Sequence, residues 1–456
     1  MAKLVKFRIR GGIAIVTLAN PPVNALEPDV LSGLFEVFKK IETHPDVKAV
    51  TLIAEGKLFS AGDDIRTMGR SQGKSSENQP SLSDVCNLIE ACPHPVVAGL
   101  HGPTLGSGMS LALAAHHRVA SPLATLGLPE VTLGIVPEGG ATQRLARLCG
   151  AEAALDLMLG GQHVTGQQAQ TLGLIDSMVQ GHLHTGAFAY AMGLMDNGAA
   201  PRPVRNIRTH LSQGEVFLKT TLRRRKALET SPLLAPAKII DCVEAALLLP
   251  FDAGLSFEKA AADECMNGPQ STALRHVFLA EREIGAELMK AEGPNRRIVD
   301  PDGRGVVSRL QHVFGAVANY LVDHGYSERD IDGALVDYGF ERPLFGAVDA
   351  RIGPNGHEIQ RRIISALMVE GAKLIEDRKA AKGADIDALS IHGLGFPRWR
   401  GGPMMAAQIM GLTRLQRDMA DWSKDAPFWA VPELVTDATK YADGFDALGR
   451  RALMLS

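Results

Sequence analysis

The sequence predicts an α/β domain in its first 190 or so residues, followed by helical regions to the end of the chain. Short apolar runs alternate with helix-like sequence in the first part, which indicates α/β architecture. Beyond about residue 300 a helical pattern of apolar residues occurs twice. At 456 residues the chain is also too long for one ordinary hydrophobic core. We therefore expect three regions: 1–195, a helical linker region 196–295, and a helical domain 296–456.

The α/β assignment rests on short apolar segments and on one glycine pair. Four segments are predicted strands: Phe7–Arg10, Ile13–Leu18, Ala49–Ala54 and Pro95–Leu100. Gly11 and Gly12 separate the first two, and glycine readily adopts the positive φ angles of a tight hairpin turn. The last two are each followed by a glycine-containing loop and then helix-like sequence.

The middle region contains two predicted helices, Phe217–Thr230 and Thr272–Met289. The first carries the basic run Arg223–Lys226, for which a solvated helix face is the favoured interpretation and a nucleotide-phosphate contact the alternative.

The last region contains a weak internal repeat of helix, Asp-Ile-Asp segment and Gly-Phe pair. The first copy comprises Arg309–His324, Asp330–Leu335 and Gly339–Phe340. The second copy comprises Ile363–Asp377, Asp385–Leu389 and Gly395–Phe396. This pattern predicts a duplicated helical module.

Composition and charge exclude several classes of partner. The formal net charge of −3 provides no electrostatic case for nucleic acid or an anionic membrane. The five cysteines are scattered without metal-ligand spacing, so we expect reduced thiols and no metal site. The N-terminus lacks the apolar core of a signal peptide, and no run of about 18 apolar residues occurs. We therefore expect a cytoplasmic protein that binds neither nucleic acid nor membrane.

Two small-residue loops are candidates for binding a negatively charged oxygen. FSAGDD (59–64) contains Gly62, which lets the amide of Asp63 turn toward a ligand. LGSG (105–108) precedes a predicted helix Met109–His116, so the amide of Ser107 would lie at a helix N-terminus, where N–H groups are unpaired. Two such donors on one oxygen are typically worth about 3–4 kcal/mol each in transition-state stabilisation.

A carboxylate in an apolar run is the candidate proton carrier. Glu130 lies in GLPEVTLGIVP (127–137), where it must either reach the surface or have a raised pKa. Glu138 follows eight residues later beside a glycine pair, and its favoured interpretation is a solvated loop acid or a charge near a helix N-cap. Ser110 precedes Glu130 by twenty residues, where the neighbouring sequence leads one to expect a second acid.

The first 190 residues resemble the crotonase (enoyl-CoA hydratase/isomerase) superfamily. The segments that carry the resemblance are NPPVNALEP (20–28), GKLFSAGDDI (56–65), HGPTLGSGMSLALA (101–114) and LGLPEVTLGIVPEGGATQRL (126–145). The rest resembles a multifunctional β-oxidation enzyme. ALRHVFLAER (273–282) is similar to the linker helix, and HGLGFPRWRGGPM (392–404) is similar to the C-terminal helical domain of 3-hydroxyacyl-CoA dehydrogenase. The resemblance implies a ββα-spiral crotonase-like domain, a linker helix and an all-α dehydrogenase-type module.

One part of that multifunctional family has no counterpart here. The family carries a dinucleotide-binding domain of roughly 180 residues between the linker helix and the helical module. In this chain only Lys290–Val307 separates them, and no G-x-G-x-x-G follows a predicted strand. We therefore expect no NAD, no other cofactor and no dehydrogenase activity, with the helical module serving as scaffold or interface.

The resemblance also implies roles for individual residues. The amides of Asp63 and Ser107 would hold the thioester oxygen, and Glu130 would be the acid/base. Ser110 stands where hydratases carry their other glutamate. The residues expected along the CoA and acyl path are Ala25, Ala61, Asp64, Ile65 and Gly106.

Three reactions of the superfamily fit this set. Enoyl-CoA isomerases use one glutamate, hydratase-lyases combine serine and glutamate twenty residues apart for retro-aldol cleavage, and dienoyl-CoA isomerases have a second acid where Glu138 stands. We expect hydration or double-bond isomerisation of an enoyl-CoA, with Glu130 as principal acid/base and Ser110 and Glu138 as modulators. Retro-aldol cleavage and a non-catalytic acyl-CoA-binding or scaffold subunit are the alternatives. The sequence leaves open whether the chain is a monomer or a homo-oligomer, and whether it binds another enzyme of its pathway.

Overall fold

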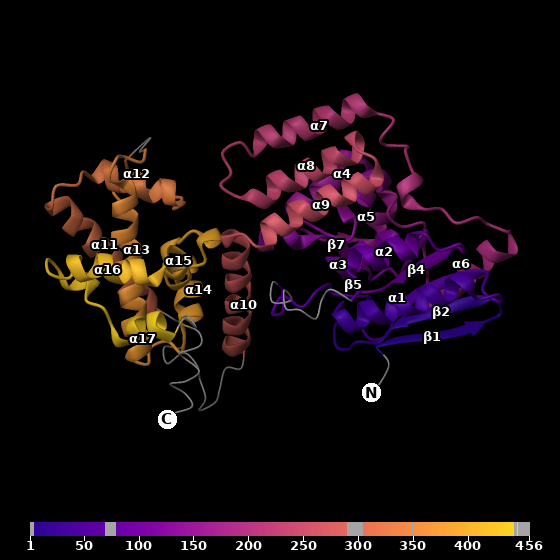
Figure 1. Ribbon diagram of the computed structural model, residues 1–456, viewed down its shortest axis with the longest axis horizontal. Coiled ribbons are helices and arrows are strands. Elements are labelled where there is room, and N and C mark those ends of the chain that lie inside the picture. Colours follow the sequence, from indigo (N-terminus) through magenta and orange to yellow (C-terminus); the bar gives the residue numbers. More distant parts are fainter. Residues whose placement is uncertain (1–3, 69–78, 290–303, 348–350, 442–444, 446–456) are drawn as a thin grey trace. The chain divides into compact units, whose positions relative to one another are not determined.

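The computed structural model describes residues 4–68, 79–289, 304–347, 351–441 and 445 (Figure 1). The chain divides into two compact units, Met1–Asn267 and Gly268–Ser456. The region predicted as a linker, 196–295, is therefore divided between the units. Most of the short connection 290–307 noted in the sequence lies outside the described residues.

A six-stranded sheet forms the centre of the first unit. Its strands, in spatial order, are β1 (Val5–Arg10), β2 (Ile13–Leu18), β3 (Ala49–Ala54), β4 (Val96–Leu100), β6 (His117–Ala120) and β9 (Ser177–Met178). β1 and β2 form an antiparallel hairpin, and every other neighbouring pair is parallel. Gly11 and Gly12 have φ angles of 54° and 81°, which confirms the predicted hairpin turn.

Helices cover both faces of this sheet, as the alternation of its side chains requires (Figure 1). On one face Ile13, Ile15 and Ile53 pack against α6 (Leu183–Asp196). On the other face Val16 and Leu52 belong to the main apolar core. The helices that contribute to this core are α1 (Pro28–Thr43), α2 (Leu82–Glu90), α3 (Ser107–Ala114) and α4 (Ala141–Gly160).

A second, smaller sheet lies beside the first and leads into α3. It contains β5 (Pro103–Leu105), β7 (Thr125–Gly127) and β8 (Val164–Thr165). β5 is parallel to β7, and β7 is antiparallel to β8. The remaining short elements of this part are η1 (Pro129–Leu133), α5 (Gly166–Thr171) and η2 (Val204–Asn206).

Three helices beyond residue 196 belong to the first unit, which differs from the predicted separate linker region. They are α7 (Gly214–Ala227), α8 (Leu234–Leu248) and α9 (Phe251–Met266). Ile239, Ile240 and Val243 of α8 are buried in the same apolar core as α4. The reason is the apolar face of α8, which is removed from water only by packing on α4. The predicted helix 217–230 begins and ends three residues earlier, as α7.

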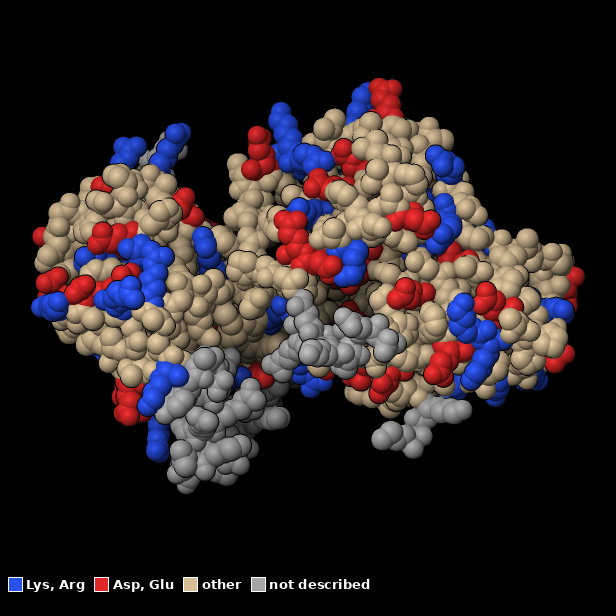
Figure 2. All heavy atoms as spheres, in the orientation of Figure 1, with Lys and Arg blue, Asp and Glu red and all other residues tan. Residues whose placement is uncertain are grey.

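The basic run on α7 is paired with acidic side chains. Arg223 and Arg224 contact Glu152 of α4, and Arg225 contacts Asp241 of α8 at 2.5 Å. These ion pairs favour the interpretation of the basic run as a solvated helix face over a phosphate contact. On the face shown in Figure 2, Lys and Arg side chains are interspersed with Asp and Glu.

The second unit is helical in its described residues. Its elements are α10 (Pro269–Met289), α11 (Arg304–Asp323), α12 (Glu328–Tyr338), α13 (Gly356–Glu376), α14 (Gly383–Leu394), η3 (Arg398–Arg400), α15 (Pro403–Met410), α16 (Leu412–Trp422), η4 (Pro427–Trp429) and α17 (Glu433–Tyr441). Its core is separate from that of the first unit and surrounds α13. Among the described residues of the whole chain, no helix is long and apolar enough to cross a membrane.

The two sequence copies form similar local structures in this unit. α11–α12 and α13–α14 are the two helix pairs, and Gly339 and Gly395 end α12 and α14 with φ angles of 117° and 69°. The carboxylate of Asp332 accepts hydrogen bonds from the following backbone, at 2.7 Å from Leu344. The carboxylate of Asp387 accepts hydrogen bonds from the amides of Met404 at 2.7 Å and Met405 at 3.1 Å, and it also pairs with His276 at 2.8 Å. In both copies a buried aspartate thus binds the backbone of the segment after its helix.

Candidate functional site

The two glycine loops singled out in the sequence lie in backbone contact. Ser60 and Thr104 form an isolated parallel bridge, and the amide of Leu105 donates to the carbonyl of Ser60 at 3.0 Å. Gly62 has a φ of 86°, and a Cβ on it would lie 2.9 Å from the carbonyl oxygen of Leu105. It would also lie 3.2 Å from the amide nitrogen of Ser107. Glycine is required here because the backbones approach too closely for a side chain.

The helix after the second loop begins two residues before its predicted start. The sequence predicted Met109–His116, whereas α3 spans Ser107–Ala114 with Gly106 as its N-cap at φ 55°. A glycine at this φ allows the chain to turn directly from β5 into the helix. Ser107 is therefore the first helical residue, and the amide of a first helical residue has no partner within its own helix.

Two backbone N–H groups of this junction are available to a ligand. Among the described residues, neither the amide of Asp63 nor that of Ser107 donates a hydrogen bond to another protein group. The side chains of the same two residues are joined, since the hydroxyl of Ser107 donates to the carboxyl group of Asp63. Asp63 is exposed as a residue, yet crowding of its carboxyl group by protein atoms raises its pKa. The structure thus brings together both predicted donors.

Glu130 is buried beside this junction without a hydrogen-bond partner for one of its oxygens. It lies in η1 and is 8% exposed, and its Oε2 atom is unpaired among the described residues. Its Oε1 atom lies 3.4 Å from where a Cβ of Gly106 would stand. Burial, assisted by the charges of Asp63, Glu258 and Glu138, raises the pKa of Glu130 to about 8. Of the two alternatives left by the sequence, burial excludes a surface position for Glu130.

Ser110 is fully buried one turn along α3. Its amide lies 3.0 Å and its hydroxyl 3.4 Å from the carbonyl oxygen of Gly106, so the hydroxyl points back along the helix. A Cβ on Gly139 would approach the Cβ of Ser110 to 3.2 Å. The space beside Ser110 is therefore closed by the Gly139 turn, and no ionisable group stands at this position.

Glu138 precedes this turn and is half-buried. Burial raises its pKa, and the nearby charge of Lys259 opposes that rise. Its charge also raises the pKa of Glu130, which means that the two carboxyl groups are close enough to interact. Glu138 thus precedes the turn that packs on Ser110, and it is less solvated than the favoured sequence interpretation held.

Glu258 of α9 is a residue that sequence reasoning missed. Its carboxylate accepts hydrogen bonds from the amides of Gly140 and Thr142 at 2.6 and 2.9 Å, and from the hydroxyl of Thr142 at 2.6 Å. It caps the N-terminus of α4 and so holds the turn that follows Glu138. Burial raises its pKa to about 7. A separation of 118 residues left no local signal that could have indicated this contact.

The residues predicted along the CoA and acyl path lie on these same loops. The amide of Ala61 donates to Val23 at 3.0 Å, and that of Leu26 donates to Gly62 at 3.1 Å, so segment 23–26, which contains Ala25, runs beside the first loop. Asp64 pairs with Arg66 at 2.6 Å. The predicted residues are buried or half-buried, and their role in binding CoA remains a prediction: Ala25, Ala61, Asp64, Ile65 and Gly106.

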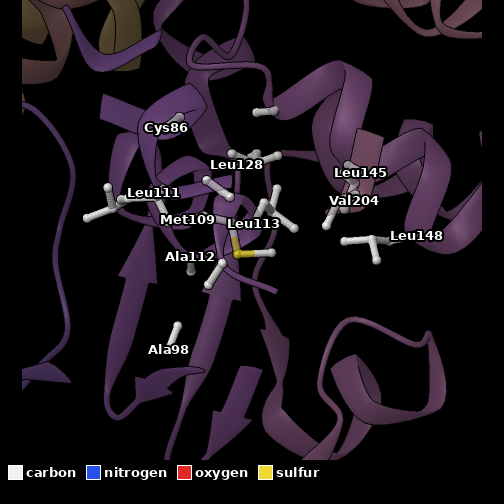
Figure 3. Close-up of a cluster of buried hydrophobic side chains, with 14 of the residues drawn as sticks. Cys86, Ala98, Met109, Leu111, Ala112, Leu113, Leu128, Leu145, Leu148 and Val204 are labelled. Carbon is white, nitrogen blue, oxygen red and sulfur yellow. The ribbon is translucent and has the colours of Figure 1, made fainter. Parts of the chain in front are cut away.

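Apolar packing anchors the helix that carries Ser107. Met109, Leu111 and Leu113 of α3 are buried in the main core, together with Ala98 of β4 and Leu128 (Figure 3). Full burial of a leucine or methionine side chain is worth about 1.5–3 kcal/mol each. The N-terminus of α3 is therefore held by a rigid core. Within the described residues, no group of three or more His, Cys, Asp or Glu side chains could hold a metal ion.

A family model agrees with this geometry. Residues 8–216 match the model described as enoyl-CoA hydratase/isomerase. These residues form an enoyl-CoA hydratase/isomerase domain. The domain includes both glycine loops, Glu130 and Glu138, whereas Glu258 lies beyond the matched residues.

About three fifths of the chain is similar to parts of larger proteins. The Peroxisomal bifunctional enzyme of Danio rerio is 35% identical over 277 residues, which are 60% of this chain and 37% of that protein. The Peroxisomal fatty acid beta-oxidation multifunctional protein AIM1 of Arabidopsis thaliana is 35% identical over 280 residues, or 59% of this chain and 38% of that protein. The chain thus matches less than two fifths of the length of these relatives. A crystal structure of enoyl-CoA hydratase/isomerase from Pseudoalteromonas atlantica T6c aligns with a TM-score of 0.47 and 20% identity, covering 61% of this chain and 98% of that chain.

Proposed function

We propose that the chain is an acyl-CoA-processing enzyme that hydrates an enoyl-CoA or moves its double bond. Glu130 is the acid/base, and the amides of Asp63 and Ser107 hold the thioester oxygen. The observation that carries the proposal is the buried carboxyl group of Glu130, whose Oε2 atom has no partner among the described residues and whose Oε1 atom lies beside Gly106. Gly106 precedes Ser107, one of the two residues whose amides donate no hydrogen bond within the described part of the chain. The enoyl-CoA hydratase/isomerase domain over residues 8–216 supports the class of substrate.

The chemistry follows from these groups. For isomerisation, the ionised carboxylate of Glu130 removes a proton from a carbon of the acyl chain, and the electron pair moves toward the thioester carbonyl. The two N–H groups stabilise the negative charge on that oxygen. The protonated Glu130 then returns the proton at the other end of the three-carbon unit, so no net charge is gained or lost. A pKa near 8 keeps both protonation states accessible at neutral pH.

Hydration requires a second group to orient the water, and we propose Glu138 for that role. The hydroxyl of Ser110 points to the carbonyl of Gly106, whereas Glu138 is half-buried and interacts electrostatically with Glu130. Retro-aldol cleavage stays an alternative within the same class of reaction. We also propose that no dinucleotide cofactor takes part, since the only chemistry assigned is proton transfer.

The test is an assay of crotonyl-CoA, a 3-enoyl-CoA and a 3-hydroxyacyl-CoA side by side with the full chain. Glu130→Gln should lower turnover of every substrate that the wild type converts by about 10²–10⁴-fold. Glu36→Gln, a change at an exposed glutamate of α1, is the matched control and should convert the same substrates as the wild type. Full turnover by Glu130→Gln would remove Glu130 from the mechanism. Tight binding of a CoA ester by calorimetry without any product would favour the non-catalytic alternative.

A further inference from the structure

We propose that Asp63 and Ser107 are positioning residues, whose side chains bridge the two loops and set the separation of the amides that hold the thioester oxygen. This inference rests on the proposed function. It assigns to the side chains of these residues a task distinct from that of their backbone N–H groups.

The first argument is that one pair of residues supplies both the donors and the bridge. The hydroxyl of Ser107 donates to Asp63, while the amides of both residues donate no hydrogen bond to any group that the structure describes. A hydrogen bond between the side chains restricts the separation of the two Cα atoms, and with it the directions of the two amides. Displacement of a donor by a fraction of an ångström weakens its bond to the developing charge, and so the bridge bears directly on the rate.

The second argument is where the backbone links between the loops end. The last links are the bridge between Ser60 and Thr104 and the hydrogen bond from Leu105 to Ser60. Beyond them each loop passes through a glycine with positive φ, Gly62 at 86° and Gly106 at 55°. Glycine is the residue with the greatest backbone freedom. The contact between Asp63 and Ser107 is thus the first hydrogen bond between the two loops after these glycines, and it joins the two residues that carry the donors.

The third argument concerns charge. A carboxylate next to a developing negative oxygen opposes it, and a shift of Asp63 toward its protonated form weakens this opposition. The rise in the pKa of Asp63 agrees with this. Asparagine at position 63 separates the two properties, because its side-chain oxygen accepts the same hydrogen bond without a charge.

The experiment is a double-mutant cycle on kcat and KM for an enoyl-CoA that the wild type converts. Asp63→Ala and Ser107→Ala keep both amides, and Asp63 is exposed, so its loss leaves the core intact. Each single change should lower kcat about tenfold with KM changed less than about twofold, and the double variant should be no slower than the slower single variant. Asp63→Asn should retain most of the activity. The proposed role of the bridge would be overturned if the losses of kcat in the two single variants added up in the double variant. It would also be overturned if Asp63→Asn were as slow as Asp63→Ala.

A second readout does not depend on turnover. Acetoacetyl-CoA binds as an enolate where two donors face its thioester oxygen, and the ultraviolet absorbance of the enolate reports this state. Loss of the bridge should weaken binding of acetoacetyl-CoA about tenfold and leave binding of free CoA unchanged. A wild type that binds the enolate but converts no thioester would contradict the proposed function and not the bridge. Equal enolate binding by wild type and Asp63→Ala would contradict the bridge alone.

Discussion

Glu90 and Glu130 are two buried glutamates of the same unit with opposite surroundings. Glu90 ends α2 and is 1% exposed, and its carboxylate accepts hydrogen bonds from Arg144 and Arg205, both at 2.9 Å. These partners lower its pKa despite burial. Glu130 is 8% exposed with an unpaired oxygen, and its pKa is raised to about 8. Burial penalises the charge of both, so the presence of a partner decides the direction of the shift.

The comparison shows how to separate a structural carboxylate from a functional one. Both carboxylate oxygens of Glu90 have partners, and these partners make further contacts: Arg144 also donates to the carbonyl of Gly139 at 2.6 Å, and the guanidinium of Arg205 lies 4.5 Å from the ring centre of Phe251. Such a network stabilises the turn beside Ser110. One oxygen of Glu130, by contrast, has no hydrogen-bond partner among the described residues. A buried polar atom without a partner lowers the stability of the fold unless a substrate supplies the partner.

The largest effect is expected at Glu130, the glutamate with an unpaired oxygen. Glu130→Gln should lower kcat on enoyl-CoA substrates by about 10²–10⁴-fold, the usual contribution of a general acid/base. Thermal unfolding at pH 7 should show no loss of stability, because glutamine removes a buried ionisable group. Steady-state kinetics measures the change in kcat, and calorimetry measures the change in stability. A kcat within a few-fold of the wild type would show that Glu130 is not the acid/base.

The paired member should respond in stability and not in chemistry. Glu90→Gln leaves the guanidinium of Arg144 buried without its counter-charge, so we expect unfolding free energy to fall by about 3–5 kcal/mol. Urea unfolding measures the change, with Glu36→Gln as an exposed control. If the loss is no greater than in the control, pairing does not distinguish the two glutamates.

Opposite pKa directions predict opposite dependences of stability on pH. The raised pKa of Glu130 contributes stability that is present below the ordinary glutamate pKa and lost as pH rises toward about 8. The lowered pKa of Glu90 contributes stability present above the ordinary value and lost as pH falls. Between pH 5 and 9, Glu130→Gln should therefore gain a few kcal/mol relative to the wild type. A difference that does not change with pH would show that Glu130 titrates normally.

Asp332 and Asp387, in the two copies of the repeat, are carboxylates paired with backbone N–H groups. Asp332→Asn and Asp387→Asn each weaken the bonds to the following segment, so each should cost about 1–3 kcal/mol. Separate chemical unfolding of the two variants checks whether the copies are energetically alike. A cost at only one aspartate would mean that the similar geometry hides different roles.

The smallest effect is expected where the paired charges are exposed. Arg223→Ala removes an ion pair with Glu152 in which both side chains are about half or more exposed, at 64% and 49%. Solvent screens such pairs, so the change in unfolding free energy should be between zero and about 1 kcal/mol. A loss comparable to that of Glu90→Gln would show that burial does not set the scale of these contributions.

Much of the first unit could be predicted from sequence because its signals are local. The strands Ile13–Leu18 and Ala49–Ala54 have the predicted bounds, and the Gly11-Gly12 turn has the expected φ angles. The glycine loops and Glu130 were found through motifs of fixed spacing. The start of α3 was predicted two residues late, since the turn at Gly106 depends on the backbone packed against it.

What the sequence by itself determined, then, is which segments turn, extend or coil, and that one carboxylate stands in an apolar run. Only the tertiary structure decided which buried charges have partners: Glu258 reaches Gly140 across 118 residues, and Glu90 meets Arg205 across 115. It also decided that α7 to α9 join the first unit and that Asp63 meets Ser107. The reason is physical: local conformation follows from neighbours along the chain, whereas pairing and desolvation follow from neighbours in space.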